Sequence, residues 1–288
     1  MGKDGCSDVY QKQWSLIVKL FQVDKTFCIH HGFYEKGIHT HVQSILNMND
    51  FVGRLLELDS KESQTQYILD AGCGIGGTVL YLTKKYPMIH CTGITMVLDH
   101  VEMAKKLAEE NQVSLRTEFL VQDFCHTGFP SNHFDAIYLL ESSCYAQQKN
   151  VLLHELFRIL KPKGRLVIID VFLTDVPLSP LLTKIYKGFC KGWGVPHLIS
   201  LVDFMDMIKA EGFSNIIKRD LTKNVTRSIL RGDVLGIPFL FSVLCKKIFF
   251  GGSYRIEEDA HFFGVLPVLT TILGINRILT YNAVTASK

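Results

Sequence analysis

A glycine-rich run follows the first expected strand of the sequence and constrains the fold more than any other feature. The run, here named the glycine loop, is Asp70-Ala71-Gly72-Cys73-Gly74-Ile75-Gly76-Gly77, and it comes directly after Tyr67-Ile68-Leu69. Glycine permits positive φ angles and a close approach of the backbone to a ligand, and the N-terminus of a following helix favours an anionic group. We therefore interpret the run as a ligand-binding strand-to-helix turn rather than as a tight turn alone.

Short apolar runs alternate with helix-period stretches between Tyr67 and Phe172, which is typical of a parallel sheet covered by helices. The expected strands in this region are 67–70, 90–94, 118–121, 134–140 and 165–172. The expected helices are 77–86, 99–111 and 151–160, the last of them broken by Lys161-Pro162-Lys163-Gly164. Beyond these, helices are expected at 179–191 and 200–211, and strands at 215–221 and 278–287.

The pattern predicts an α/β fold, a Rossmann-like doubly wound and mostly parallel seven-stranded sheet, with a helical N-terminal flap and a helical insertion before the last strand. We divide this single structural domain into three parts. The helical flap comprises residues 1–60, the cofactor-binding core residues 61–175, and the substrate lid, which also completes the sheet, residues 176–288.

The net charge and the cysteines indicate which partners and which compartment to expect. Lys and Arg number 31 against 28 Asp and Glu, for a formal net charge of +3, so we expect no nucleic-acid partner. Eight cysteines are spread singly without a C-x-x-C pair, which favours thiols in a reducing, cytoplasmic compartment.

The chain is nonetheless rich in apolar residues, with 47% hydrophobic residues and a mean hydropathy of +0.17. Much of this excess lies in the runs 234–245 and 262–275, which Pro238, Gly264 and Pro267 interrupt. Each run is shorter than the roughly 18 to 20 residues that a membrane-spanning helix needs. The runs favour a lid, a lipophilic pocket or a face in peripheral contact with a membrane; buried core helices are the alternative.

The spacing of the glycines limits the choice of ligand. It is G-x-G-x-G, which differs from the dinucleotide fingerprint G-x-G-x-x-G and is not followed by the lysine of a phosphate-binding loop. A nicotinamide-dependent enzyme also needs an acidic residue at the end of the second strand, where this chain has Gly93-Ile94-Thr95-Met96. An NAD-dependent oxidoreductase is therefore a weaker alternative.

An acidic residue followed by G-x-G-x-G resembles the first motif of the class I S-adenosylmethionine-dependent methyltransferases. Within them, Gly93-Ile94-Thr95 resembles the sterol and tocopherol C-methyltransferase group and the cyclopropane-fatty-acid synthases. The resemblance implies S-adenosylmethionine as cofactor, with His100 in a place where relatives often have glutamine and Asp123-Phe124 against the adenine. The cofactor-binding residues that it implies are Asp70, Gly72, Gly74, Gly76, Thr95, Met96, His100, Asp123, Phe124 and Leu140. A turn cap is the alternative role of Asp123.

Two further segments resemble the same group. The run from Glu141 to Ala146 is similar to a Glu-small-small-Cys-His-Ala motif, with Tyr145 in place of the histidine, and Glu141 is expected to point toward the ligand. The alternative is that Glu141 only caps its loop. His30-His31-Gly32-Phe33-Tyr34 is similar to an H-x-G-Y-Y stretch in a helical flap over the cofactor. Histidines in this segment also suggest a metal site, but suitable partners are sparse and we expect none.

Methylation of an alkene carbon generates a carbocation, which aromatic rings stabilise and a base deprotonates. We predict Glu141, with His31 as second choice, as the base, and Tyr34 as a further catalytic residue; Phe33, Tyr145 and Trp193 are the predicted substrate-binding residues. The expected acceptor is a hydrophobic isoprenoid or sterol-type molecule. An N- or O-methyltransferase of a small amine or phenol is the alternative, and a non-catalytic methyltransferase-like binding module is another. The oligomeric state is not predicted.

Overall fold

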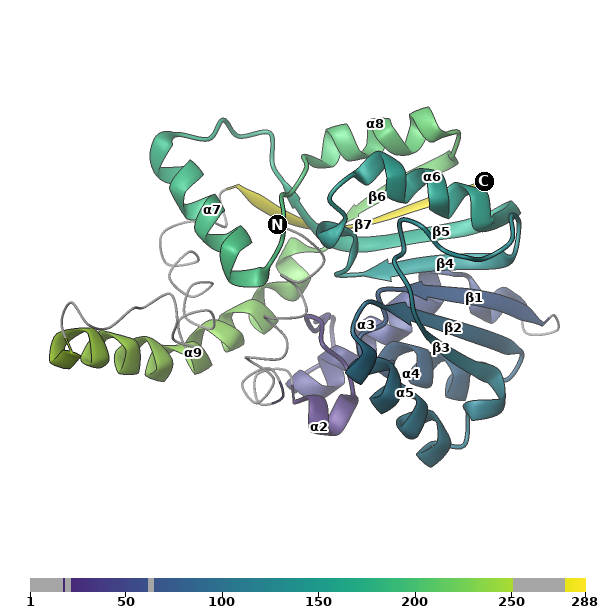
Figure 1. Cartoon of the computed structure of the whole chain (residues 1–288), viewed down its shortest axis with the longest axis horizontal. Helices are drawn as coiled ribbons and strands as arrows, with labels where there is room; N and C mark the ends of the chain where they lie inside the picture. Colours follow the sequence, from purple (N-terminus) through teal and green to yellow (C-terminus); the bar gives the residue numbers. More distant parts are fainter. Residues whose placement is uncertain (1–17, 19–21, 62–64, 251–277) are drawn as a thin grey trace.

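A computed structural model describes residues 18, 22–61, 65–250 and 278–288 of the chain. In these residues seven strands form one sheet in the order β3-β2-β1-β4-β5-β7-β6, and β7 runs antiparallel to both of its neighbours (Figure 1). The strands are β1 Gln66–Ala71, β2 Ile89–Thr95, β3 Thr117–Val121, β4 Phe134–Leu140, β5 Leu160–Leu173, β6 Ser214–Asp220 and β7 Leu279–Ser287. The predicted Rossmann-like, mostly parallel fold is confirmed.

Helices connect the strands along the chain. The longer ones are α3 His41–Leu55, α4 Gly77–Lys85, α5 Leu98–Glu110, α6 Lys149–Ile159, α7 Pro180–Trp193, α8 Leu201–Glu211 and α9 Thr222–Phe250. Short turns of helix are α2 Val23–Thr26, η1 Leu58–Lys61, η2 Ser114–Arg116 and η3 Ser143–Tyr145. The local sequence explains two of the helix ends. Thr40 and Gln43 form a capping box at the start of α3, and Gly212 ends α8 with a φ of 107°.

The sheet is covered on both faces because side chains alternate along each strand. Ile68 and Tyr138 pack with side chains of α3, α4 and α5, whereas the next residues, Leu69 and Leu139, pack with side chains of α6 and α8. The central strands are thus buried on both sides, as the continuous apolar runs predict. Their carboxyl ends are left as the edge where a ligand site can form.

Three expectations about secondary structure need correction. Lys161–Gly164 does not separate helix from strand, because β5 already begins at Leu160, which pairs with Phe134; the register then shifts before the pairing of Ala136 with Arg165. The segment that holds His30 to Tyr34 is not helical and connects α2 to α3.

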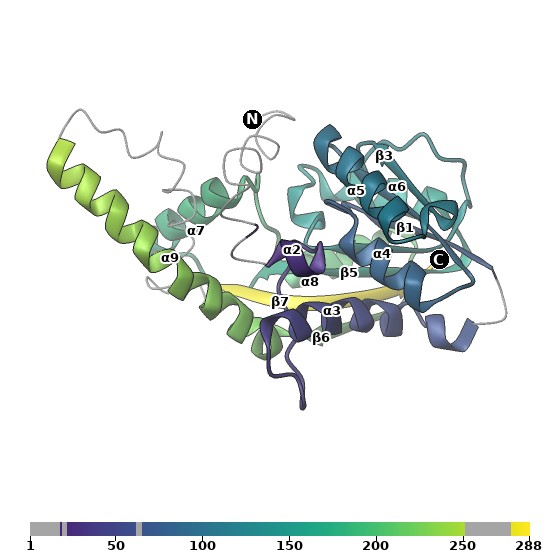
Figure 2. The same ribbon diagram turned by 90° about the horizontal axis from the view of Figure 1, so that it is seen from below.

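The third correction concerns the apolar run 234–245, which lies inside the continuous helix α9, so Pro238 does not end it. This helix extends away from the sheet (Figures 1 and 2). The run 262–275 lies outside the described residues. Among the described helices, none combines the length and apolar character that a membrane span requires.

Candidate active site

The predicted site residues follow four neighbouring parallel strands. Asp70 on β1 pairs with Gly93 on β2 and with Tyr138 on β4, and Thr95 at the end of β2 pairs with Val121 on β3. The glycine loop, Thr95, the segment after β3 and the segment after β4 therefore lie at the same edge of the sheet. This edge is where doubly wound folds bind ligands.

The glycine loop requires glycine at its turns. Gly72, Gly74 and Gly76 have φ values of 112°, 53° and 84°, in the left-handed region that glycine favours. A Cβ on Gly72 would lie 2.3 Å from the Cβ of Ser142, so this glycine also allows close packing against the segment after β4. A Cβ on Gly74 would meet only the Cδ1 atom of Ile29, at 3.9 Å. The backbone at Gly74 is thus open to the approach of a ligand, which fits the implied cofactor.

Asp70 is buried at the start of this loop. Its Oδ2 accepts a hydrogen bond of 2.7 Å from the Tyr138 hydroxyl. Burial raises the pKa of Asp70 to about 7, against the opposing effects of Tyr138 and the nearby His30. The pKa of this carboxyl group therefore lies near neutral pH, and its hydrogen bond with Tyr138 links β1 to β4.

The end of β2 carries three predicted cofactor residues. Thr95 is buried, and its Oγ1 accepts a hydrogen bond of 3.3 Å from the backbone of Val97, whereas the side chain of Met96 is exposed. His100 is buried in the first turn of α5, and burial lowers its pKa to about 4. The imidazole is therefore neutral at pH 7 and able to act as both donor and acceptor.

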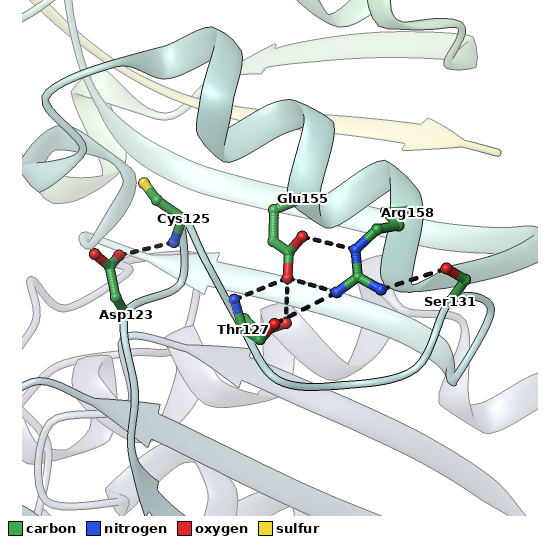
Figure 3. A network of polar contacts seen from close by, with 6 residues as sticks. All are labelled: Asp123, Cys125, Thr127, Ser131, Glu155 and Arg158. Carbon is green, nitrogen blue, oxygen red and sulfur yellow. Dashed lines mark hydrogen bonds and ion pairs between the residues drawn. The ribbon is translucent and has the colours of Figure 1, made fainter.

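Asp123 is positioned by its own turn. Its Oδ1 accepts a hydrogen bond of 2.8 Å from the backbone of Cys125, which is the capping role that sequence left as the alternative (Figure 3). A contact with adenine stays a prediction for Asp123. Phe124 packs against the core on the α6 and α8 side of the sheet, and Leu140 against the core on the other side.

Figure 3 also shows how the segment after β3 is attached to α6. Glu155 on α6 accepts hydrogen bonds from the Thr127 backbone, at 2.8 Å, and from the Thr127 hydroxyl. Arg158 binds the same carboxylate through two nitrogens, each at 2.8 Å, and also contacts the hydroxyl of Ser131. Hydrogen bonds from Arg158 and Thr127 lower the pKa of Glu155 against the opposing effect of burial. These contacts hold the segment that carries Asp123 and Phe124.

Glu141 lies directly after β4, with a φ of 53°, and joins three parts of the chain. Its Oε1 accepts a hydrogen bond of 2.7 Å from the backbone N–H of His31 and one of 2.6 Å from the hydroxyl of Tyr281 on β7. The ring of His31 lies edge-on to that of Tyr281, with centroids 6.3 Å apart. The structure thus brings Glu141 and His31 together. It adds Tyr281, which no sequence motif indicated.

His30 attaches the N-terminal segment to α3. Its Nδ1 lies 3.0 Å from the carbonyl oxygen of His31, and its Nε2 lies 3.0 Å from Oδ1 of Asn49. Burial lowers the pKa of His30, but Cys28, Glu141 and the His31 carbonyl outweigh that effect and raise it to about 9. The imidazolium can donate to both oxygens. Within the described residues, no group of three His, Cys, Asp or Glu side chains is placed to bind a metal ion.

The predicted aromatic residues have different surroundings. Phe33 is fully buried and stacks on Phe51 at 4.5 Å, so its ring belongs to the core, and its contact with substrate stays a prediction. The ring of Tyr34 lies under the guanidinium group of Arg227, 4.7 Å away. Tyr145 and Trp193 pack against one cluster that includes Cys144 and Cys190, and Trp193 also packs against the cluster that includes Ile75 of the glycine loop. Tyr145 and Trp193 therefore stay candidates for the substrate wall.

The sheet order and the glycine loop match those expected of the class I S-adenosylmethionine-dependent methyltransferases. Residues 69–168 match the family model described as a methyltransferase domain, which confirms the predicted resemblance to methyltransferases. The solved structure of the [4+2]-cyclase SpnF has the same fold, with a TM-score of 0.76, 20% identity, and coverage of 98% of this chain and 94% of that one.

Two curated relatives agree with the predicted group. The probable tocopherol O-methyltransferase of Oryza sativa is 28% identical over 68% of this chain and 57% of its own length. The sterol 24-C-methyltransferase of Aspergillus fumigatus is 29% identical over 54% of this chain and 41% of its own length. The matched region thus spans about half the length of these relatives.

Proposed function

We propose that this chain uses S-adenosylmethionine to methylate a carbon of a hydrophobic, isoprenoid or sterol-type molecule. The observation that supports this most is the Glu141 carboxylate, which the amide of His31 and the hydroxyl of Tyr281 hold in place. The next residue, Ser142, contacts the glycine loop. A carboxylate in this place can stabilise a positively charged acceptor and remove its proton. The names of the tocopherol and sterol relatives support a hydrophobic acceptor.

The bound cofactor would supply an electrophilic methyl group. We assign its binding to the glycine loop and to the residues after β2 and β3, chiefly Thr95, Met96, His100, Asp123 and Phe124. Leu140 at the end of β4 completes this set. These residues would hold the cofactor and the acceptor at reacting distance, because direct transfer of the methyl group depends mainly on the positions of the two reactants.

We assign the acceptor side to the aromatic cluster and to Glu141. Tyr145 and Trp193 present rings that attract a transient cation. Glu141 accepts the proton at its carboxylate, and His31 is the second candidate base. Tyr34, with its backbone N–H bonded to the Asn224 carbonyl at 3.0 Å, links the N-terminal segment to α9.

Methylation of a phenolic oxygen is the second candidate, since the relative from Oryza sativa is named an O-methyltransferase. In that reaction Glu141 would orient the acceptor and take one proton, without a carbocation. The two candidates differ in the atom that carries the new methyl group.

The test is incubation of the purified chain with methyl-labelled S-adenosylmethionine and, separately, lipid extracts, phenols and small amines. We expect label in an isoprenoid or sterol product, on carbon as determined by NMR. Label only in the amine or phenol pool would overturn the carbon acceptor. Cofactor binding without transfer to any pool would instead support a non-catalytic binding module.

We further propose that α9 rests on an anionic membrane surface. Leu230, Val234, Phe241 and Ile248 are each about half exposed or more, and their spacings of four and seven residues place them on one helical face. The helix sequence also carries five Lys or Arg against one Asp. Basic residues near an anionic bilayer attract it by about 1 kcal/mol each.

This contact predicts that the chain sediments with vesicles that contain phosphatidylserine and that Phe241→Ser together with Ile248→Ser reduces the bound fraction severalfold. Leu115→Ser is the matched control, because Leu115 is 96% exposed in η2, outside α9. Equal sedimentation of the α9 variant and the control would contradict the proposal.

A further inference from the structure

The loop between β4 and α6, residues 141–148, is held by a buried lysine that the proposed reaction does not use. Lys149 is the first residue of α6 and is only 5% exposed. Its Nζ donates hydrogen bonds to the carbonyl oxygens of Ser143, Cys144 and Ala146, at 3.0, 2.9 and 2.6 Å. A cation is unfavourable at a helix N-terminus and costly to bury, so simple helix stability does not explain this lysine.

A buried carboxylate binds the same loop through its donors. Asp170 on β5 is 1% exposed, and its Oδ2 accepts hydrogen bonds from the Ser143 hydroxyl at 2.6 Å and from the Cys144 backbone at 2.9 Å. Its Oδ1 accepts one from the backbone of Val171 at 2.8 Å. The cation thus binds the carbonyl groups of the loop and the anion binds its N–H and O–H groups.

Burial works against the charged form of both side chains. Burial lowers the pKa of Lys149, and the nearby Cys144 and Asp170 oppose this. Burial raises the pKa of Asp170, and its hydrogen bonds from Ser143, Val171 and Cys144 oppose this. The charged form of each ion therefore depends on its hydrogen bonds to the loop, and the charged form of Lys149 is further stabilised by Asp170.

The loop residues that Lys149 and Asp170 bind lie next to residues of both the cofactor side and the acceptor side of the candidate site. Glu141 comes directly before the bound segment and Tyr145 lies within it. Ser142 donates a hydrogen bond of 2.6 Å to the carbonyl oxygen of Ala71, and its side chain packs where Gly72 lacks a Cβ. A shift of residues 142–146 would thus displace the Glu141 carboxylate and the Tyr145 ring relative to the glycine loop.

We propose that Lys149 and Asp170 are positioning residues that set the place of Glu141 and Tyr145 for the methyl acceptor. This inference rests on the proposed function of Glu141. A displacement of about 1 Å in a reacting group can lower a rate by about 100-fold. We therefore expect the pair to affect turnover far more than cofactor binding.

The test compares Lys149→Met with Lys161→Met. Lys161 makes an ion pair of 2.8 Å with Asp135 at a partly exposed position, where β4 and β5 begin and at the opposite edge of the sheet from the loop. For Lys149→Met we expect kcat to fall by about 100-fold while the Kd for S-adenosylmethionine stays within about threefold. Amide hydrogen exchange of residues 142–146 should become faster. The control should change none of these quantities.

A second comparison separates positioning from general stability. In a Glu141→Gln background, Lys149→Met should lower kcat by less than about threefold further, because residues that act as a unit are not additive. Full additivity, or wild-type kcat in Lys149→Met, would overturn the proposal. If Lys149→Met does not fold, Ser143→Ala and Asp170→Asn take its place with the same criteria.

Failure of the proposed function would be recognised from a different measurement, the transfer of label by the wild-type chain. If the wild-type chain transfers no label to any acceptor, the reaction assignment fails, and hydrogen exchange alone decides about the loop. Unchanged exchange of residues 142–146 in Lys149→Met would then overturn the positioning role.

Discussion

Replacing Glu141 by glutamine is expected to lower the turnover of methyl transfer by about 10²- to 10⁴-fold, the range typical of a general base. Glutamine keeps the size of the side chain and one oxygen that can accept from the His31 amide and the Tyr281 hydroxyl. It removes the negative charge and the site that takes up the proton. The measurement is single-turnover transfer of labelled methyl at saturating S-adenosylmethionine, with cofactor affinity measured by calorimetry.

Glu118→Gln is the matched control, because Glu118 is an exposed residue of β3. It should retain wild-type turnover and affinity. If Glu141→Gln also keeps turnover within threefold of the wild type, the carboxylate is not the base and its role is to cap the loop. A change in cofactor affinity alone would lead to the same conclusion.

Much of the fold could be predicted because its central strands are continuous apolar runs with polar or glycine-rich ends. The strand Phe134–Leu140 has the predicted bounds, and the expected helix 77–86 differs from α4 by one residue. Both segments show a local pattern of apolar residues, because burial against the rest of the protein requires apolar side chains at these positions. The same pattern places the glycine loop and Glu141 at strand ends, since parallel strands share one carboxyl edge.

Contacts between distant parts of the chain could not be predicted in the same way. Tyr281 is 140 residues from Glu141 in sequence, and the two meet only because β7 returns antiparallel beside β5. Lys149 lies outside the expected helix 151–160, and its role depends on carbonyl groups of the loop that includes η3.

The side chain of Phe33 also has a direction that its motif does not specify. The motif that contains it marks a segment beside the ligand, but a motif does not indicate which way each side chain points. The ring of Phe33 points into the core against Phe51, while the backbone amide of the neighbouring His31 reaches Glu141. Side-chain direction in an irregular segment is set by tertiary packing, so periodicity has no bearing on it.

Gly74→Trp is expected to weaken the binding of S-adenosylmethionine by about 5- to 150-fold, the equivalent of about 1 to 3 kcal/mol for an overpacked site. A side chain at Gly74 would start in a space where only Ile29 Cδ1 comes within 4 Å, so an indole there would occupy the approach to the loop backbone. The measurement is isothermal titration calorimetry with S-adenosylmethionine and, to separate the methyl group from the rest of the molecule, with S-adenosylhomocysteine.

Gly37→Trp is the control that separates a blocked site from backbone strain. Gly37 has a φ of 89°, also in the left-handed region, and a Cβ there would have no atom within 4 Å. Both variants therefore place tryptophan at a left-handed, sterically open glycine, and only Gly74 lies in the glycine loop. Because the strain is of the same kind in both, a loss of affinity confined to Gly74→Trp would locate the cofactor at the loop. Equal affinity in the two variants would exclude it from there, and the assignment of Thr95 and Asp123 as cofactor contacts would fail with it.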